Sequence, residues 1–378
     1  MSLPQAPPPG TALLVDVPGG GSLKISIHTS DRTNFKRCRQ RWDFSSNIRG
    51  NLEPKKPVTP LWFGTGIHEA LAAYYDPEIE VTSTSTQYLK LGEGVLQRMP
   101  RDPDYGIFVF ENFVDSWLTS LGEPSEDQYL WAKENRELGL GMLSNYFKWC
   151  RINDDFEVIW VEKEYEVGIP GLPGVSYSFR CDGLIKTKHH TWLLEHKTTA
   201  QFPDQTEWLM MDDQCGSYLW GLSQLDPPIY AEGVVYNELK KKTPQPLRSL
   251  LAGGYSINRS QDTTFEIALE TLMKEHGSRK IPQKYWEFLD YLKYKPNNFV
   301  KRTPVRRNRK EIELLGGMLR YEVLDMVNNP AIYRSPSRVN CSSCPFVSPC
   351  ILRWEGGDHQ YLLDIEFKKR ESYYGKVY

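Results

Sequence analysis

Three side chains near the middle of the sequence have the types and spacing needed to hold a divalent cation against a phosphate. Asp182 ends one alternating run of residues, and Glu195 and Lys197 lie in the next run. Side chains two positions apart on a strand share a face, so Glu195 and Lys197 point the same way and His196 points opposite. If the two runs pair as a hairpin, Asp182 meets Glu195. Two such carboxylates bind a hard cation such as magnesium and leave positions for phosphate and water.

A surface hairpin with an ordinary ion pair between Glu195 and Lys197 would produce the same short motif, so a lone Glu-x-Lys triplet is weak evidence. Here the triplet is strengthened by Asp182 on the adjacent run, by two leucines before the glutamate and by two threonines after the lysine. In a hydrolytic site of this kind, Lys197 would orient or deprotonate the attacking water and offset phosphate charge.

Four of the seven cysteines are spaced as ligands of one centre. Cys341, Cys344 and Cys350 lie within ten residues, with two prolines that favour a tight wrap, and Cys38 is the expected fourth donor. Such a centre would close a loop of roughly 300 residues, for which loop-entropy models give about 5 kcal/mol. Four thiolates satisfy zinc as readily as iron, so the spacing leaves both metals open. The remaining thiols are expected in the core: Cys150, Cys181 and Cys215.

The composition is that of a globular chain, with 378 residues of which 40% are hydrophobic and 12% aromatic. The sequence has no recognisable secretory signal, so the cysteines favour metal ligation over a disulfide framework. No run approaches the roughly 18 to 20 apolar residues of a membrane span, and we expect a cytoplasmic protein without a membrane partner.

The basic charge is concentrated in one segment. The net charge is −2, but residues 293–310 carry eight positive charges and no acid. A charge run is more often a solvated face, yet aromatic residues interleaved with these cations can stack on unpaired bases while the cations bind phosphates. The side chains expected to contact DNA are Lys301, Arg302, Arg306 and Arg307.

The elements that must position these residues follow from the periodicity of apolar residues. Helical spacing predicts a helix over residues 65–75, with His68 in its first turn. Three alternating runs are expected to be strands of one sheet: residues 156–167, 175–185 and 190–199. A helix over residues 208–222 and a strand over residues 229–236 are expected to follow.

The domain organisation is expected to be simple. Residues 1–22 are rich in proline and glycine and predict a flexible leader. The rest, residues 23–378, is expected to form a single domain. Its parts are residues 23–75 with the first cluster cysteine and the histidine helix, 76–155 as a helical insertion, 156–240 as the catalytic sheet core, and 241–378 with the basic segment and the later cysteines.

These motifs together resemble the PD-(D/E)xK nuclease superfamily, in which Asp and then Glu-x-Lys lie on two neighbouring strands. The helix containing Phe63-Gly-Thr-Gly-Ile-His68 and the pair Gln214 and Tyr218 resemble its RecB-like and AddB-like branch. One early cysteine followed by a late Cys-x2-Cys-x5-Cys is similar to the iron-sulfur staple of AddB-type exonucleases and of CRISPR-associated adaptation nucleases. Cys181 replaces the proline of the superfamily's name, a position that this branch commonly relaxes.

The resemblance implies an α/β fold with a restriction-endonuclease-like mixed central sheet, flanking helices, a helical insertion and a [4Fe-4S] cluster joining the N- and C-terminal parts, with structural Zn²⁺ as the alternative. It also implies Mg²⁺ or Mn²⁺ held by His68, Asp182, Glu195 and the backbone carbonyl of His196, with Lys197 positioning the water. Gln214 and Tyr218 would support the site or DNA. A further acid near the site is expected from one strand face: Glu162, Glu164 and Glu166.

The activity implied by the resemblance is metal-dependent hydrolysis of single-stranded or end-processed DNA, most simply by an exonuclease of bacterial or phage recombination and repair. The sequence contains no Gly-x4-Gly-Lys-Ser/Thr phosphate loop, so a helicase or recombination partner is expected to supply the ends. Two alternatives stay open: a noncatalytic scaffold that binds DNA ends with the same fold, and a zinc-stabilised endonuclease.

Overall fold

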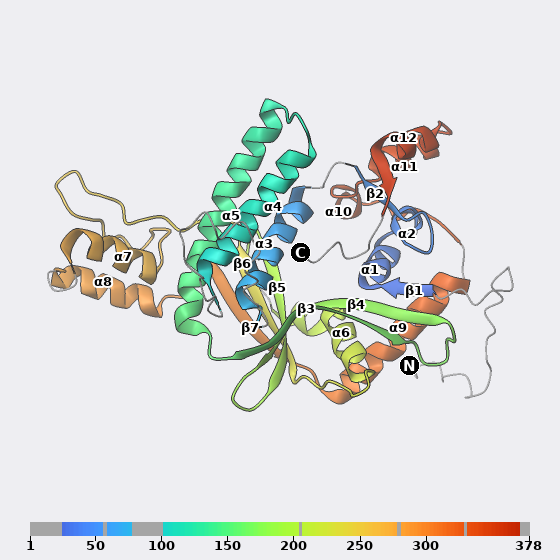
Figure 1. The fold of residues 1–378 in the computed structure, drawn as a ribbon, viewed down its shortest axis with the longest axis horizontal. Coiled ribbons are helices and arrows are strands. Elements are labelled where there is room, and N and C mark those ends of the chain that lie inside the picture. Colours follow the sequence, from blue (N-terminus) through green and yellow to red (C-terminus); the bar gives the residue numbers. More distant parts are fainter. Residues whose placement is uncertain are drawn as a thin grey trace, which may run out of the picture.

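The structure is a computed structural model that describes residues 25–55, 59–77, 101–203, 206–277, 281–328 and 331–370. The expected flexible leader, residues 1–22, lies outside the described residues. Within them, a mixed sheet stands between helices on both of its faces (Figure 1). The α/β fold class with a mixed central sheet is therefore confirmed.

Six strands form the central sheet, in chain order β1 (Ile25–His28), β3 (Glu157–Gly168), β4 (Val175–Lys186), β5 (Thr191–Thr199), β6 (Gly233–Lys240) and β7 (Val300–Arg306). Their spatial order is β1-β4-β5-β6-β7, with β3 paired to β4. The β3-β4-β5 meander is antiparallel, β6 runs parallel to β5, and β1 runs parallel to β4. The three consecutive strands predicted from alternation are thus confirmed, whereas β1 and β7 were not predicted.

Strand β4 changes its partner along its length. Val175 to Ser178 pair with β1, whereas Gly183 to Lys186 pair with β5. The other edge of β4 pairs with β3 along most of its length. Strands β4 and β5 therefore separate just before Gly183, at Asp182, and this opens a fork in the sheet.

Helices cover both faces of the sheet because alternate side chains of each strand point to opposite faces. One face packs against α3 (Thr59–Tyr75), α4 (Pro103–Ser120) and α5 (Glu126–Asn153), and the other against α6 (Asp213–Ser223) and α9 (Arg309–Asn328). In β5, Leu194 packs in the core between the sheet and α3, α4 and α5, and Leu193 packs in the core between the sheet and α6 and α9. The predicted helical insertion is represented by α4 and α5, which share a core with α3 and the sheet.

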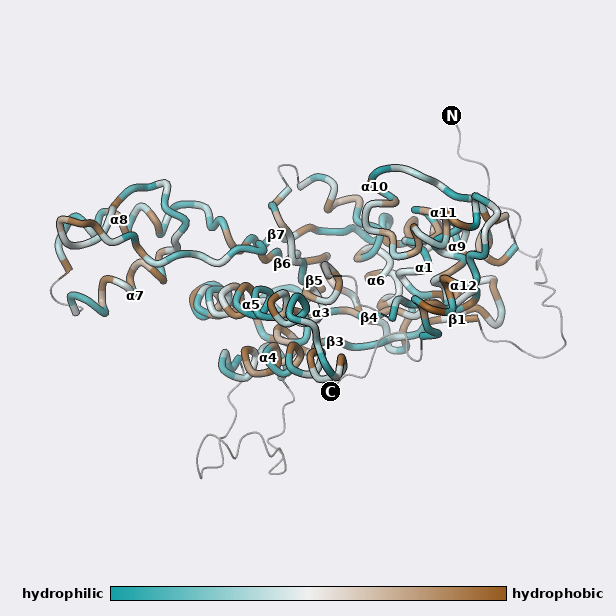
Figure 2. Tube along the Cα trace, turned by 90° about the horizontal axis from the view of Figure 1, so that it is seen from above, coloured by the Kyte–Doolittle hydropathy of each residue, from teal (hydrophilic) through white to brown (hydrophobic). Residues whose placement is uncertain are grey.

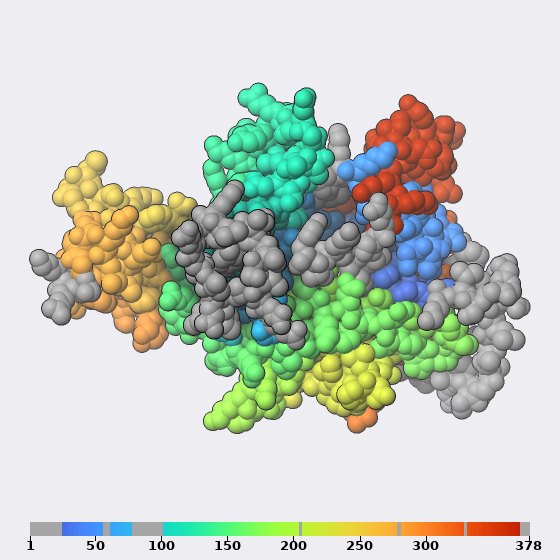
Figure 3. All heavy atoms as spheres, in the orientation of Figure 1, coloured from blue at the N-terminus to red at the C-terminus, as the bar shows by residue number. Residues whose placement is uncertain are grey.

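A second helical unit, formed by α7 (Phe265–His276) and α8 (Gln283–Tyr294), lies between β6 and β7 in the chain. It has its own apolar core, in which Leu272, Tyr285 and Leu289 are buried. Figures 1 and 2 show this unit at one end of the molecule, and the space-filling view shows it as a separate lobe (Figure 3). This unit was not predicted from the sequence, although its apolar spacing is helical.

The N- and C-terminal segments meet at the opposite end of the molecule (Figure 3). The elements there are α1 (Thr29–Arg37), α2 (Arg39–Ser45), β2 (Leu52–Pro54), α10 (Arg338–Cys341), α11 (Val347–Trp354), α12 (His359–Glu366) and β8 (Phe367–Lys369). Strand β2 pairs with β8, and Phe44 packs with Phe346 and Phe367. Backbone pairing and an apolar cluster therefore join the two segments independently of any metal. Among the described helices, none is long and apolar enough to cross a membrane.

Candidate metal centre and active site

The fork between β4 and β5 brings the expected catalytic carboxylates together. Asp182 Oδ2 accepts a hydrogen bond from the backbone N–H of His196 at 2.7 Å, which fixes this carboxylate beside β5. Its other oxygen, Oδ1, lies 3.4 Å from Nδ1 of His68 on α3. The negative charge of Asp182 acts on buried Glu195, so the hairpin places the two acids close together.

Lys197, a residue of β5, is held between this strand and helix α6. Its Nζ lies 2.5 Å from Oε1 of Glu195 and donates to Oε1 of Gln214 at 3.2 Å. Gln214 Nε2 in turn donates to Tyr218 Oη at 2.8 Å. The Gln-x3-Tyr pair therefore reaches the site, where it fixes the lysine.

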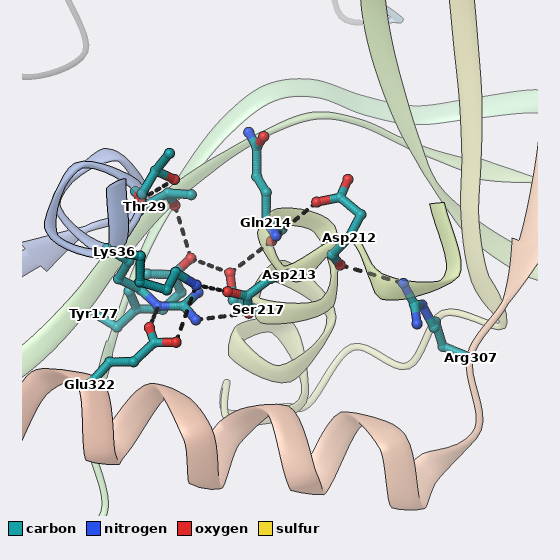
Figure 4. A network of polar contacts seen from close by, with 11 residues as sticks. Thr29, Lys36, Tyr177, Asp212, Asp213, Gln214, Ser217, Arg307 and Glu322 are labelled. Carbon is teal, nitrogen blue, oxygen red and sulfur yellow. Dashed lines mark hydrogen bonds and ion pairs between the residues drawn. The ribbon is translucent and has the colours of Figure 1, made fainter. Parts of the chain in front are cut away.

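Helix α6 is itself anchored at its first residue by α1 and α9 (Figure 4). Asp213 lies 2.8 Å from Nη2 of buried Arg32 and also pairs with Lys36, both on α1. Glu322 of α9 pairs with the same two cations. The next residue after Asp213 is Gln214, so this ion-pair network fixes the backbone that presents Gln214 to Lys197.

Glu162 of β3 is the acid of its strand that joins the site. The register on either side places it opposite Asp182. His68, Glu162 and Asp182 offer ligand atoms that all lie within 4.8 Å of one another. The φ of Glu162 is 45°, a left-handed conformation that costs a non-glycine residue about 1 to 3 kcal/mol and is characteristic of functional sites. The other two candidate acids of this strand are exposed: Glu164 and Glu166.

Each carboxyl of the site has a basic neighbour: Glu195 pairs with Lys197, Glu162 lies 3.0 Å from Arg180, and Asp182 lies beside His68. Burial, and then the charge of Asp182, raises the pKa of Glu195 to about 7 and the pKa of Glu162 to about 8. Burial alone would raise the pKa of Asp182, but the adjacent His68 holds it below its usual value. Burial lowers the pKa of His68, yet Asp182 outweighs that effect and raises it to about 9.

One oxygen of the site has no hydrogen-bond partner. Oε2 of Glu195 is buried and unpaired, although a buried carboxylate oxygen is normally satisfied. His68, Glu162 and Asp182 form a set of close donors suited to a divalent cation, and the unpaired oxygen of Glu195 lies outside that set. The residues present therefore fit Mg²⁺ or Mn²⁺.

We expect the affinity for Mg²⁺ to rise with pH. Metal binding needs carboxylates and a neutral imidazole, whereas Glu195, Glu162 and His68 retain protons up to pKa values of about 7, 8 and 9. Protons therefore compete with the cation on the acid side and are lost as the pH increases. Calorimetric titration from about pH 6 to about pH 9, repeated in buffers of different ionisation enthalpy, measures both affinity and proton release. A constant affinity with no proton release would contradict this prediction.

The four clustered cysteines lie where the N- and C-terminal segments meet. Nδ2 of Asn340 donates to the backbone oxygen of Arg37 at 3.2 Å, which places Cys38 beside the segment containing Cys341. The thiol of Cys350 interacts electrostatically with those of Cys38 and Cys344. All seven cysteines are free, including these four. The four cysteines therefore lie in the same part of the fold, and their binding of one centre stays a prediction.

An arginine beside these thiols lacks a partner. Nε and Nη1 of Arg41 are buried without a hydrogen bond, and its charge interacts with the thiols of Cys344 and Cys38. A thiolate-ligated centre is anionic and would satisfy this cation. Among the described residues, no three thiols lie within 4.8 Å of one another, whereas a tetrahedral zinc with bonds of about 2.3 Å would hold thiolates about 3.8 Å apart.

The four basic residues expected to contact DNA occupy different environments. Arg302 exposes 14% of its side chain and pairs internally with Asp154. Arg307 donates to two backbone carbonyls of the short helix η2 (Glu207–Met211) and its C-cap, at 2.8 and 3.4 Å. These two guanidinium groups make contacts inside the protein, and their binding of DNA stays a prediction. Arg306 exposes 69% of its side chain, and Lys301 is half-buried on the same strand.

Comparison with known proteins agrees with this geometry. The family model described as the PD-(D/E)XK nuclease superfamily matches residues 29–351. The chain belongs to the PD-(D/E)XK nuclease superfamily. This family implies metal-dependent nuclease activity, typically with Mg²⁺ or Mn²⁺, on DNA.

Other comparisons add little. No curated protein has a sequence significantly similar to this chain. A solved structure entitled "Crystal structure of SSO0001" is 12% identical, covers 64% of this chain and 95% of its own, and has a TM-score of 0.28. At that TM-score the similarity supports no conclusion about fold or function.

Proposed function

We propose that this protein is a metal-dependent exonuclease that hydrolyses single-stranded or free-ended DNA. One observation carries the catalytic part of the proposal: Asp182, Glu195 and Lys197 converge at the fork between β4 and β5. A degenerate, noncatalytic relative would be expected to have lost one of these three groups. The exonuclease mode is supported by the sequence resemblance to the RecB-like and AddB-like branch.

The side chains have separate roles in the proposed reaction. His68, Glu162, Asp182 and Glu195 would hold Mg²⁺ or Mn²⁺, with the backbone carbonyl of His196 as a further donor. A cation bound there would offset charge on the phosphate and increase the acidity of water. Lys197, fixed by Glu195 and Gln214, orients the attacking water and stabilises the negative charge that develops on the phosphate.

We further propose that Cys38, Cys341, Cys344 and Cys350 bind a [4Fe-4S] cluster. The unpaired cation of Arg41 beside two of the thiols supports an anionic centre. The choice of an iron-sulfur cluster over zinc rests on the resemblance of the cysteine spacing to the iron-sulfur staple of AddB-type exonucleases. The cluster would have a structural role, because it joins segments that are remote from the β4–β5 fork in the chain.

A digestion experiment tests the proposed activity. The full-length protein would be incubated with Mg²⁺ and end-labelled linear or circular DNA, each single- or double-stranded, with EDTA as the metal-free control. We expect linear single strands to be degraded and circular single strands to resist. Equal cutting of circles would identify an endonuclease, and binding of ends without cleavage would identify a noncatalytic scaffold. A role in recombination or repair, with a helicase partner that supplies ends, is the setting we propose.

We expect Lys301 and Arg306 to bind DNA phosphates. Replacing both with alanine should reduce the salt dependence of single-strand binding, because each lost phosphate contact lowers the slope of log K against log salt by about 0.7. Binding measured over a salt series would report this change. The matched control is a double variant in which two exposed lysines of the β4–β5 hairpin, Lys186 and Lys188, are replaced with alanine. An unchanged slope would exclude β7 from the DNA-binding surface.

A further inference from the structure

His196 is buried directly behind the metal centre and contacts it in two ways. Its backbone N–H holds the Asp182 carboxylate at 2.7 Å. Its ring meets the ring of His68 edge-on, with centroids 6.0 Å apart. On another side, its ring stacks on Tyr75 at 5.7 Å with an interplanar angle of 16°. A rotation of the His196 ring would therefore disturb His68, whereas the contact with Asp182 depends on the backbone of His196.

The orientation of the His196 ring is set by one amide. Nδ2 of Asn237, a fully buried residue of β6, lies 2.8 Å from Nδ1 of His196. Because the amide nitrogen is a donor, Nδ1 is the acceptor and the ring proton resides on Nε2. Asn237 therefore selects both the tautomer and the rotamer of this histidine.

A closed ring of polar contacts holds the Asn237 amide in place. Nδ2 also donates to Tyr146 Oη at 2.7 Å, and that hydroxyl lies 2.7 Å from Tyr75 Oη. Tyr75 Oη donates to Asp154 at 2.9 Å, and Asp154 pairs with Arg302 Nη1 at 2.8 Å. Arg302 Nε returns to Oδ1 of Asn237 at 3.3 Å.

Both ends of the Asn237 amide are thus fixed. A flipped amide would direct its NH₂ group at the Arg302 guanidinium and its oxygen at Nδ1 of His196, which removes a hydrogen bond at each end. The closed ring of polar contacts also explains why Arg302 of the basic segment points inward. Its guanidinium packs over Trp149 at 4.6 Å and Phe156 at 5.1 Å, which further restricts its position.

We propose that Asn237 and Arg302 are positioning residues, which orient the ring of His196 and through it the metal ligand His68. This proposal rests on the metal centre of the proposed function but not on the DNA that is cut. Partners that orient metal ligands typically change metal affinity or activity by about 10- to 100-fold when they are removed. The effect is therefore measurable without a nuclease assay.

The test compares two buried asparagines. Asn237→Leu preserves size but removes all three side-chain hydrogen bonds, and Asn145→Leu on α5 replaces an asparagine at a similarly buried position outside the ring of polar contacts. Calorimetric titration with Mn²⁺ should show affinity weakened about 10-fold or more in Asn237→Leu only, and thermal unfolding would be followed in parallel. Equal Mn²⁺ affinity in both variants and the wild type would contradict the proposal and show that the ring of polar contacts has a structural role only.

A second variant keeps the test decisive if Asn237→Leu does not fold. Arg302→Lys retains the ion pair with Asp154 but lacks the Nε–H that fixes the amide. We expect weaker Mn²⁺ binding and a lower kcat, with KM for DNA unchanged. Wild-type Mn²⁺ affinity in this variant would overturn the proposal. A wild-type protein that binds Mn²⁺ without cutting DNA would contradict the nuclease proposal alone.

Discussion

Replacing Lys197 with alanine is expected to reduce DNA cleavage by about 10³-fold or more while Mn²⁺ binding is retained. Among the described ion pairs, Glu195 pairs with Lys197 alone, and Nζ of the lysine lies 2.5 Å from Oε1 of the glutamate. Its pKa is raised because Glu195 outweighs the effect of burial, so it stays charged at neutral pH. Its removal deletes the group that orients water and stabilises developing charge, but leaves the metal ligands in place.

The matched control for this variant is Lys188→Ala, an exposed lysine of the β4–β5 hairpin. Initial rates on end-labelled single-stranded DNA would be compared at saturating Mg²⁺, with calorimetric Mn²⁺ binding as the independent readout. Lys188→Ala should cleave at the wild-type rate. Activity of Lys197→Ala within a few-fold of the control would contradict the role proposed for the lysine.

Replacing Cys344 with serine is expected to remove the metal centre and to destabilise the protein strongly. The centre would join Cys38 to the segment containing Cys341 and thereby restrict a loop of roughly 300 residues, a constraint of about 5 kcal/mol in loop-entropy models. For a chain of this size, each kcal/mol shifts Tm by about 2 to 4 °C, so we expect a Tm lower by about 10 to 20 °C.

Ser342→Ala, a change in the same exposed loop, is the control for the cysteine variant. Iron, zinc and acid-labile sulfide would be measured in both proteins, together with thermal unfolding. We expect iron and sulfide in the wild type and in Ser342→Ala, and neither in Cys344→Ser. Stoichiometric zinc without sulfide would replace the iron-sulfur assignment, and an unchanged Tm would show that strand pairing of β2 with β8 is sufficient to close the fold.

The local sequence pattern was sufficient to predict much of the sheet, including β5, which contains Glu195 and Lys197. Alternation of side chains is a property of nearest neighbours, so β3, β4 and β5 could be recognised without tertiary information. The same period of two placed Glu195 and Lys197 on one face. The spacing of Gln214 and Tyr218, four residues apart on a helix, likewise predicted that they act together, and their side chains are hydrogen-bonded in the structure.

Tertiary structure decided what those local patterns left undetermined. Three acids of β3 were equivalent in sequence, and only the strand register and the left-handed backbone of Glu162 bring that one to Asp182. Arg302 was one cation of a basic run, and its inward direction depends on Asp154 and Asn237, which are remote in the chain. Sequence by itself specified the residue types and local periods of the site. Long-range pairing selected which charges meet, because the distance between two side chains depends on how separate elements pack.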